Sequence, residues 1–359
     1  MHIRFVHAFV MLALAEGLDE RPVEALLAPD LDPAAALAAP PPELPPRVQR
    51  RLLDPGLPQR AAAVLAAAAR DGQQVLTPAD PRWPQRFTDR AQRPLALFVR
   101  GDPQVLAVGP AVAVVGSRTP TPYGADAAQE LCGALAAAGT VLWSGLARGV
   151  DAAAHLASVQ HATPTVAVLG GGLDRIYPPE HQQLADRILA GGGCLVSELP
   201  PGRRARRGHF VRRNRLLAMG AEAVIVIEAS LTSGALHTAR FAADCGTDVF
   251  ALPGPWRSER SQGCHRLVSE GANLIEGPDE LLRALGLSAN RSAPAALALV
   301  RSADERAIVT ALSEGPRPAD LLQRETGLER AAFLRALFGL EQRGAVSRAP
   351  GDLWRRTGC

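Results

Sequence analysis

The stretch that decides the fold is ‘AVAVVGSRTPTPYGADAAQELCGALAAAGTVLWSGLARGVDAAAH’, residues 111–155. It begins with a short run that is apolar throughout, passes through a turn into a helical pattern, and then repeats this order. A strand without alternating polar positions is buried on both faces, and strands that alternate with helices pair in parallel. The stretch therefore predicts two β–α units of a parallel sheet that is covered on both faces.

The same alternation continues to about residue 286, with expected strands ‘AVAVV’, ‘TVLW’, ‘TVAVL’, ‘CLVSE’, ‘AVIVIE’ and ‘DVFALP’. It predicts an α/β fold with a doubly wound, mostly parallel, Rossmann-like sheet, which we place at residues 76–287. Proline-broken helices over residues 1–75 indicate a small module of the sterile-alpha-motif or helix-hairpin type, or a helical cap without a ligand. Residues 75–102 are expected as an extended lead-in, 288–300 as a linker, and 301–359 as a winged helix.

Composition limits the classes of function. The chain has 359 residues and a net charge of only +3, so any basic surface must be local. All 39 basic side chains are arginine, a planar donor that is always charged. The five cysteines form no CxxC pair and the histidines no HExxH, so we expect neither a disulfide framework nor a metal site. The N-terminal apolar run is short and is followed by Glu16, and no segment is long enough to span a bilayer. We therefore expect a cytoplasmic protein.

The loops beyond the carboxyl ends of the strands are the expected ligand site of such a sheet. They read ‘GSRTPTPYG’, ‘SGLARGVD’, ‘GGGLDRIYPPEH’, ‘ELPPGRRARRGHF’ and ‘EASLTSGALHT’. Four of them place Gly or Ser directly before a helix, where free backbone N–H groups and the helix dipole favour anions. The glycines also have a purely structural interpretation as turn formers, and Thr232 or Ser233 as a helix cap. Likewise, Asp151 is interpreted as a possible helix cap and Tyr177 as a packing residue.

Residues 200–220, ‘PPGRRARRGHFVRRNRLLAMG’, hold seven arginines, no acid and one aromatic residue, Phe210. A solvated loop is the alternative interpretation. The sequence lacks the GxGxxG turn and ribose-binding acid of dinucleotide sites, a P-loop, a nucleophile elbow and a catalytic carboxylate pair. We therefore expect a polyanionic ligand that is larger than a mononucleotide. Single-stranded nucleic acid fits best, because arginines follow phosphates and an aromatic ring stacks on bases.

Seven segments in order resemble the DNA-processing protein A family (DprA, also called Smf): ‘VAVVGSR’, ‘SGLARGVDAAAH’, ‘AVLGGGLDRIYPPEH’, ‘SELPPG’, ‘HFVRRNRLLA’, ‘SLTSGALHTARFAADCGTDVFALPG’ and ‘GCHRLVSEGANLI’. The resemblance covers about residues 75–285, and the two ends are similar to the variable first domain and the winged helix of many members. It implies a non-catalytic homodimer without a cofactor, which binds and protects single-stranded DNA during natural transformation or recombination and helps to load the RecA recombinase.

The resemblance also implies site residues. Gly116, Ser117 and Arg118 would contact DNA, and Phe210 matches the base-contacting aromatic residue. Arg207 stands where members often carry lysine, a departure that keeps the charge. The arginine- and asparagine-containing part of the motif adds Arg212, Arg213, Asn214 and Arg215. Our own inference from loop positions adds Gly145, Arg148, Ser233 and Gly234. The segment ‘GCHRLVSEGANL’ would form the dimer and RecA surface, with His265, Val268 and Leu274 on it.

Two alternatives remain. Related Rossmann-like proteins include nucleotide-cleaving enzymes and cofactor carriers, but the cleaving enzymes use a PGGxGTxxE run, and ‘SLTSGALHTARF’ stands at the comparable place without its glutamate. The winged helix has two candidate ligands, duplex DNA and a protein. Its expected recognition segment, ‘LERAAFLRALFGLEQRG’, mixes acids with arginines and so does not decide between them.

Overall fold

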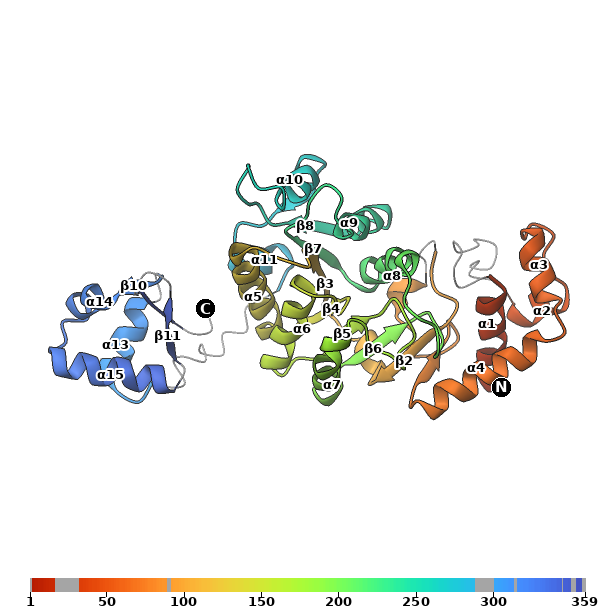
Figure 1. Ribbon diagram of the computed structural model, residues 1–359, viewed down its shortest axis with the longest axis horizontal. Helices are drawn as coiled ribbons and strands as arrows, with labels where there is room; N and C mark the ends of the chain where they lie inside the picture. The colour runs from red at the N-terminus through yellow and green to blue at the C-terminus, as the bar shows by residue number, and fades with distance from the viewer. Residues whose placement is uncertain are drawn as a thin grey trace. The chain divides into compact units, whose positions relative to one another are not determined.

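The computed structural model of this protein describes residues 2–16, 32–88, 92–287, 300–312, 315–343, 345–349 and 353–356. The chain divides into two compact units, residues 1–288 and 289–359, whose elements are labelled in Figure 1. Apart from residue 300, the expected linker lies outside the described residues.

The first unit is built on a nine-stranded sheet in the order β1-β2-β6-β5-β4-β3-β7-β8-β9. All neighbours from β6 to β9 pair in parallel, and β1 and β2 form the two antiparallel pairings, β1 with β2 and β2 with β6. The predicted mostly parallel sheet is confirmed. The lead-in over residues 75–102 contributes most of the two antiparallel strands, which the sequence pattern did not indicate. The strands are β1 (Gln74–Leu76), β2 (Leu97–Gly101), β3 (Ala111–Gly116), β4 (Val141–Ser144), β5 (Thr165–Val168), β6 (Cys194–Ser197), β7 (Ala223–Ile227), β8 (Asp248–Ala251) and β9 (Asn273–Leu274).

The direction of winding reverses at β3. From β3 the chain proceeds to β4, β5 and β6 on one side, and helix α8 (Arg207–Gly220) then leads back to β7 on the other side. β3 and β7 are direct neighbours, with Val114 opposite Ile225 and Gly116 opposite Ile227. In open α/β sheets, ligands bind beyond the carboxyl ends of the strands at such a reversal point. The topology therefore directs attention to the space above Gly116.

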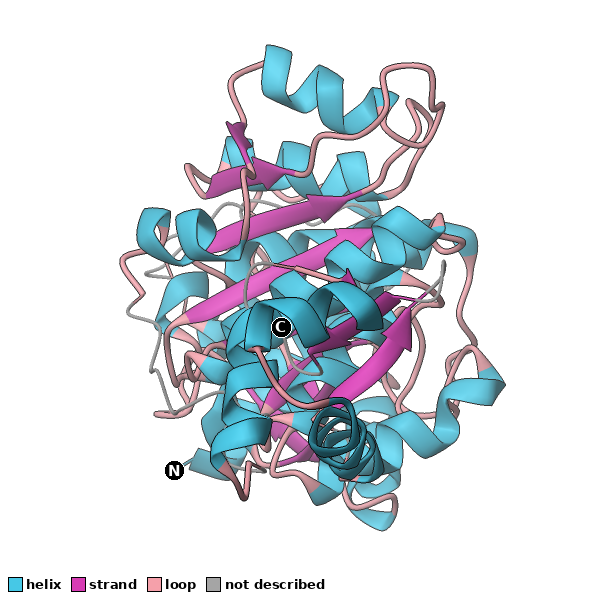
Figure 2. Cartoon of the chain, turned by 90° about the vertical axis from the view of Figure 1, so that its left-hand side faces the viewer, coloured by secondary structure: helices cyan, strands magenta, loops and turns pink. Residues whose placement is uncertain are grey.

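Helices cover both faces of the sheet, as Figure 2 shows around the strands. Successive residues of a strand point to opposite faces. Ala113 and Val115 of β3 belong to the core that includes residues of α8 and α9, whereas Val112 and Val114 belong to the core that includes α5 and α6. The remaining helices of the sheet region are α5 (Pro122–Ala137), α6 (Val150–Gln160), α7 (Gln182–Ala190), α9 (Ala235–Asp244), α10 (Gln262–Ser269) and α11 (Pro278–Ala284), with short 3₁₀ turns η2 (Gln85–Phe87), η3 (Pro103–Leu106) and η4 (Pro179–His181).

Four helices precede the sheet: α1 (His2–Glu16), α2 (Pro33–Ala38), α3 (Pro46–Leu52) and α4 (Leu57–Arg70). They share a small apolar core to which Leu12 and Val48 contribute. A second cluster joins Val10 and Ala61 to Ala96, just before β2. The helical module is thus packed on the antiparallel side of the sheet, and the expected boundary between residues 75 and 76 falls inside β1.

The second unit is a winged helix, as predicted. Helices α13 (Ala303–Ala311), α14 (Ala319–Thr326) and α15 (Arg330–Gln342) pack with a three-stranded antiparallel sheet in the order β10-β12-β11. Those strands are β10 (Arg317–Pro318), β11 (Val346–Ala349) and β12 (Leu353–Arg356). Phe333, Leu337, Leu340 and Trp354 form the centre of its core. In neither unit does the described part of the chain contain a helix that is long and apolar enough to cross a membrane.

Candidate functional site

A cleft of about 900 Å³ opens at the carboxyl edge of the sheet, at the reversal point between β3 and β7. Three segments form most of its wall: the turn after β3, the loop after β7 and the first half of α8. Of the predicted site residues, the cleft is lined by Gly116, Ser117, Arg118, Arg207, Phe210, Arg213, Asn214, Ser233 and Gly234. Segments more than a hundred residues apart in sequence therefore converge on one space, as the loop positions predicted.

The turn after β3 is held by its neighbours. The amide of Ser117 donates to the carbonyl of Ile227 at 3.2 Å, and the Ser117 carbonyl accepts from the amide of Val150 at 3.1 Å. The buried carboxylate of Glu228 accepts from the amide of Thr121 at 2.8 Å. Because these bonds restrain the backbone of the turn, the exposed side chain of the intervening Arg118 is presented from a restrained position.

Phe210 lies in the cleft between two partners. The guanidinium carbon of Arg118 is 5.6 Å from the centre of the Phe210 ring, within the range of a cation–π contact. The ring of Tyr177 lies at 5.7 Å between centroids and is tilted by 48°. Tyr177 was interpreted as a packing residue, but it is 51% exposed and lines the cleft. The cleft thus presents two aromatic rings with a cation beside them.

The triple glycine after β5 makes room for this arrangement. A Cβ atom on Gly170 would lie 2.9 Å from the ring of Phe210, and one on Gly171 would lie 3.1 Å from the backbone of Ala205. Contacts this short are not tolerated without movement. The structural interpretation of these glycines is therefore the one that the geometry supports: they let the arginine-rich segment and α8 approach the sheet.

Arg213 lines the floor of the cleft but is almost fully buried. Its Nη1 donates to the carbonyl of Val168 at 2.6 Å, and a Cβ atom on Gly145 would lie only 1.7 Å from that nitrogen. Burial lowers the pKa of Arg213 to about 10, opposed by the nearby Asp151. Asp151 accepts from the amides of Gly145 at 3.1 Å and Ala147 at 3.3 Å. It thus ties down the loop ahead of α6, whose N-cap is Gly149.

Two further predicted DNA contacts, Arg212 and Arg215, lie away from the cleft wall in buried ion pairs. Arg215 donates two hydrogen bonds of 2.5 Å to Glu198 and one of 2.8 Å to the carbonyl of Gln92. Arg212 pairs with Glu16 of α1 at 3.0 Å and with Glu198 at 3.5 Å. Burial acts to raise the pKa of Glu198, but the two guanidinium groups hold it below its usual range. These side chains join the helical module to α8.

The exposed cations of the site are Arg118 and Arg207. Within the described part of the chain, neither forms an ion pair with an acidic side chain. Arg148 is also exposed, but it forms an ion pair with Glu180, and neither of these residues lines the cleft. Asn214 bridges two walls, because its Nδ2 donates to the carbonyl of Gly234 at 3.1 Å.

Gly234 is the N-cap of α9, and the Ser233 hydroxyl accepts from the amide of Ala235 at 3.3 Å. The interpretation of Thr232 or Ser233 as the helix cap is therefore wrong, because Gly234 occupies the N-cap position and no side chain caps the helix. Ser233 and Gly234 do line the cleft.

Sequence reasoning missed the fourth wall of the cleft. Glu259 and Arg260, from the segment between β8 and α10, line it together with His237 of α9. The Nη1 of Arg260 donates to Ser117 Oγ at 3.1 Å and to the carbonyl of Thr119. The available signal was positional, because this segment follows a parallel strand and so must emerge at the same edge.

The expected dimer surface lies at the far end of the sheet. β9 is an edge strand, and its Leu274 is 47% exposed. Val268 of α10 is half-buried against the core, and His265 hydrogen-bonds through Nε2 to the carbonyl of Gly254 at 3.0 Å. Only Leu274 of the three therefore presents a large apolar side chain to solvent.

The comparison with known families decides the relationship. A sequence model described as DNA recombination-mediator protein A matches residues 74–286, more than half of the chain. The chain belongs to the DNA recombination-mediator protein A family. A model of the DprA winged-helix domain matches residues 291–352.

Relatives of this DprA-family chain extend over most of its length. It is 39% identical over 313 residues to the putative DNA processing protein DprA of Mycobacterium tuberculosis, covering 82% of this chain and 80% of that protein. It is 36% identical over 293 residues to protein Smf of Escherichia coli, covering 79% and 78%.

Two solved structures of the family are similar. DNA processing protein A from Streptococcus pneumoniae superposes with a TM-score of 0.58 at 34% identity, covering 66% of this chain and 84% of that one. The protein from Helicobacter pylori gives a TM-score of 0.54 at 30% identity, covering 59% and 95%, and its structure concerns a unique single-stranded DNA binding mode.

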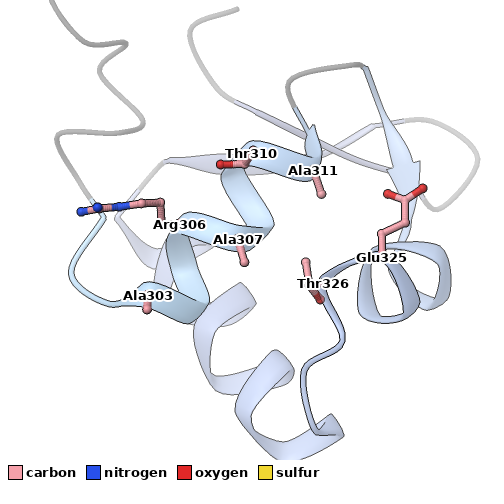
Figure 3. A pocket seen from close by; sticks show the side chains of 7 residues that line it. All are labelled: Ala303, Arg306, Ala307, Thr310, Ala311, Glu325 and Thr326. Carbon is pink, nitrogen blue, oxygen red and sulfur yellow. The ribbon is translucent and has the colours of Figure 1, made fainter.

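The DprA winged helix has a shallow cavity of its own, of about 640 Å³, between α13 and the end of α14. Figure 3 shows that its wall consists largely of small side chains and that the guanidinium of Arg306 extends away from Glu325 and Thr326. No charged groups converge there. Among the described residues of either unit, no cluster of three His, Cys, Asp or Glu residues is placed to hold a metal ion.

Proposed function

We propose that this protein binds single-stranded DNA in the cleft above β3 and β7, without turning it over chemically, and that it does so in the cytoplasm during natural transformation or recombination. The observation that carries the proposal is the group formed by Phe210, Tyr177 and Arg118 at the reversal point of the sheet. Aromatic rings beside cations bind single strands with little dependence on sequence, because every base has a face to stack on.

The charges of the cleft support the same ligand. Arg118 and Arg207 are exposed on two different walls, so phosphates on both sides of a stacked base would meet a cation. The N-terminus of α9 at Gly234 adds backbone N–H groups and the positive end of a helix dipole. A loop-lined cleft of about 900 Å³ accommodates bases one at a time and has no room for a complete duplex.

The test is a comparison of single-stranded and duplex oligonucleotides of the same length across a salt series. We expect tighter binding of the single strand, with log Kd rising against log salt by about 0.7 per neutralised phosphate. Equal or tighter binding of a blunt duplex at physiological salt would refute the proposal. Release of a base from a nucleoside monophosphate would instead support the nucleotide-cleaving alternative.

We further propose that the protein acts as a homodimer through the surface formed by α10 and β9, and that this surface meets RecA when the recombinase is loaded. The exposed Leu274 lies on β9, which pairs with β8 on one side and is the edge of the described sheet on the other, and this supports an apolar contact at this place. The loading step is tested by mixing the protein with RecA and with single-stranded DNA that is covered by a single-strand-binding protein. The measured quantity is the lag before RecA filaments form. An unchanged lag would remove it.

For the winged helix we propose a protein contact rather than duplex binding. Leu334 and Phe338 lie one helical turn apart on α15 and are 38% and 46% exposed. An apolar pair on the recognition helix is better suited to contact a protein surface than to contact DNA phosphates. Arg335 is an exposed cation on the same helix. Duplex affinity that survives Phe210→Ala and is lost in Arg335→Ala would favour duplex DNA instead.

A further inference from the structure

The loop between β8 and α10 carries the most exposed large apolar side chain among the described residues. Trp256 is 75% exposed, whereas Trp83, Trp143 and Trp354 are all nearly fully buried. A solvent-exposed tryptophan leaves in water a large apolar area whose burial would stabilise the fold. Such a residue calls for a partner outside its own fold.

The turn that carries Trp256 is held in place. The amide of Ser258 donates to the carbonyl of Pro255 at 2.9 Å, which closes a turn around the tryptophan. Before the turn, Tyr123 Oη donates to the carbonyl of Pro253 at 2.7 Å. After it, Arg260 is bound to the turn that follows β3. The loop is thus anchored on both sides of Trp256, which reduces the ordering cost of binding.

The anchors also locate the turn. The loop follows β8, a parallel neighbour of β7, and therefore emerges at the carboxyl edge of the sheet. Glu259, three residues after Trp256, already lines the cleft. Three residues of extended chain span at most roughly 11 Å. Trp256 therefore stands at the rim of the cleft on its β8 side, within reach of a strand that leaves the Phe210 pocket.

The chemistry of the turn fits a nucleic acid. The guanidinium carbon of Arg257 lies 4.6 Å from the centre of the Trp256 ring. One face of the indole is thereby covered by a cation, and the largely exposed side chain keeps area on which a base can stack. The residues that follow Trp256 in the turn, Arg257 to Arg260, are all polar or charged, which suits a polyanionic ligand better than an apolar protein surface.

We propose that Trp256 and Arg257 form a second stacking contact for the single strand whose first contact is Phe210. The inference rests on the proposed function, because it extends the same ligand along the rim of the same cleft. It predicts that the second contact matters only when the strand is long enough to reach from the pocket to the rim.

Tryptophan fluorescence tests the contact directly, since Trp256 is the one exposed tryptophan of the four in the chain. The probes are oligothymidylates of about 4 and about 16 nucleotides, which span the usual range of single-strand site sizes. The longer oligonucleotide should quench wild-type fluorescence, and Trp256→Phe should abolish that quenching while retaining most of the affinity. Trp256→Ala should weaken binding of the longer oligonucleotide by roughly 5- to 150-fold and leave the shorter one unchanged.

Val108→Ala is the matched control, because Val108 is also an exposed apolar residue, at 52%, but precedes β3 at the opposite edge of the sheet. It should behave as wild type, and all variants should share one melting temperature. Wild-type binding without quenching, or Trp256→Ala binding at wild-type affinity, overturns the inference and leaves the proposed function standing. A Trp256→Ala variant that changes only its oligomeric state also overturns it. If the wild type binds neither oligonucleotide, the proposed function itself fails.

Discussion

Replacing Phe210 by alanine separates a ring that stacks on a base from a ring that only supports the fold. Phe210 is partly buried, and its neighbours Arg118 and Tyr177 are themselves exposed. Truncation would therefore widen an open cleft rather than leave a closed cavity. Without the cavity contribution we expect a loss of less than about 2 kcal/mol in the free energy of unfolding.

The same substitution should also reduce the free energy of DNA binding. A stacked base contributes about 1–3 kcal/mol by alanine substitution, so Phe210→Ala should raise Kd by roughly 5- to 150-fold. The salt dependence should stay nearly unchanged, because no charge is removed. Arg118→Ala and Arg207→Ala should instead lower both the affinity and the slope, by about 0.7 per lost phosphate contact.

Phe87→Ala supplies the structural control. Phe87 is 1% exposed and lies edge-on to Trp83 and Trp143, with ring centroids at 5.9 and 6.3 Å. Its removal from a closed core should cost about 3–5 kcal/mol of stability. Titrations of a labelled oligothymidylate, together with urea unfolding of each variant, measure both quantities. The reasoning is refuted if Phe210→Ala binds as tightly as wild type, or if it loses as much stability as Phe87→Ala.

Three further predictions concern stability, acid sensitivity and assembly. Gly145→Ala would place a methyl group on the buried guanidinium of Arg213 and should lower the free energy of unfolding by about 1–3 kcal/mol or more. Gly208→Ala is the control and should be neutral or stabilising, because the space around its Cβ position in the first turn of α8 is open. Equal melting temperatures of the two variants would contradict this prediction. Burial lowers the pKa of His155 to about 3 from 6.5, so the unfolded chain takes up a proton that the folded protein refuses. Stability should therefore fall by about 1.4 kcal/mol per unit as the pH drops from 6.5 towards 3, and His155→Gln should flatten that part of the profile in urea unfolding at successive pH values; parallel profiles would show that another group is responsible. Leu274→Arg should convert a dimer into a folded monomer, and so should Val268→Arg if that half-buried position tolerates the charge. Light scattering with circular dichroism checks this, and a wild type that is monomeric at micromolar concentration would end the dimer proposal.

The sequence was sufficient for the parallel part of the sheet because the relevant signals are local. Apolar runs such as that of β3 need no alternation when both faces are covered, and the helical segments between them leave parallel pairing as the consistent arrangement. Loops that follow parallel strands emerge at the carboxyl edge, so Ser117, Phe210 and Gly234 could be expected at one edge from their positions in the chain. The strand order, and with it the reversal point at β3, came from the structure. The three helices and the wing of the second unit were equally readable from their own patterns.

Tertiary structure alone decided what the arginines of α8 do. The net charge of residues 200–220 indicates a cationic surface. However, an α-helix has 3.6 residues per turn, so neighbouring arginines face different surroundings. Arg207 faces the cleft, while Arg213 and Arg215 are buried. The groups that satisfy the buried ones, Glu198 and the carbonyl of Val168, stand 17 and 45 residues away in the chain. No local pattern records such a partner, because a buried charge is tolerated only where the fold brings its counter-group to it.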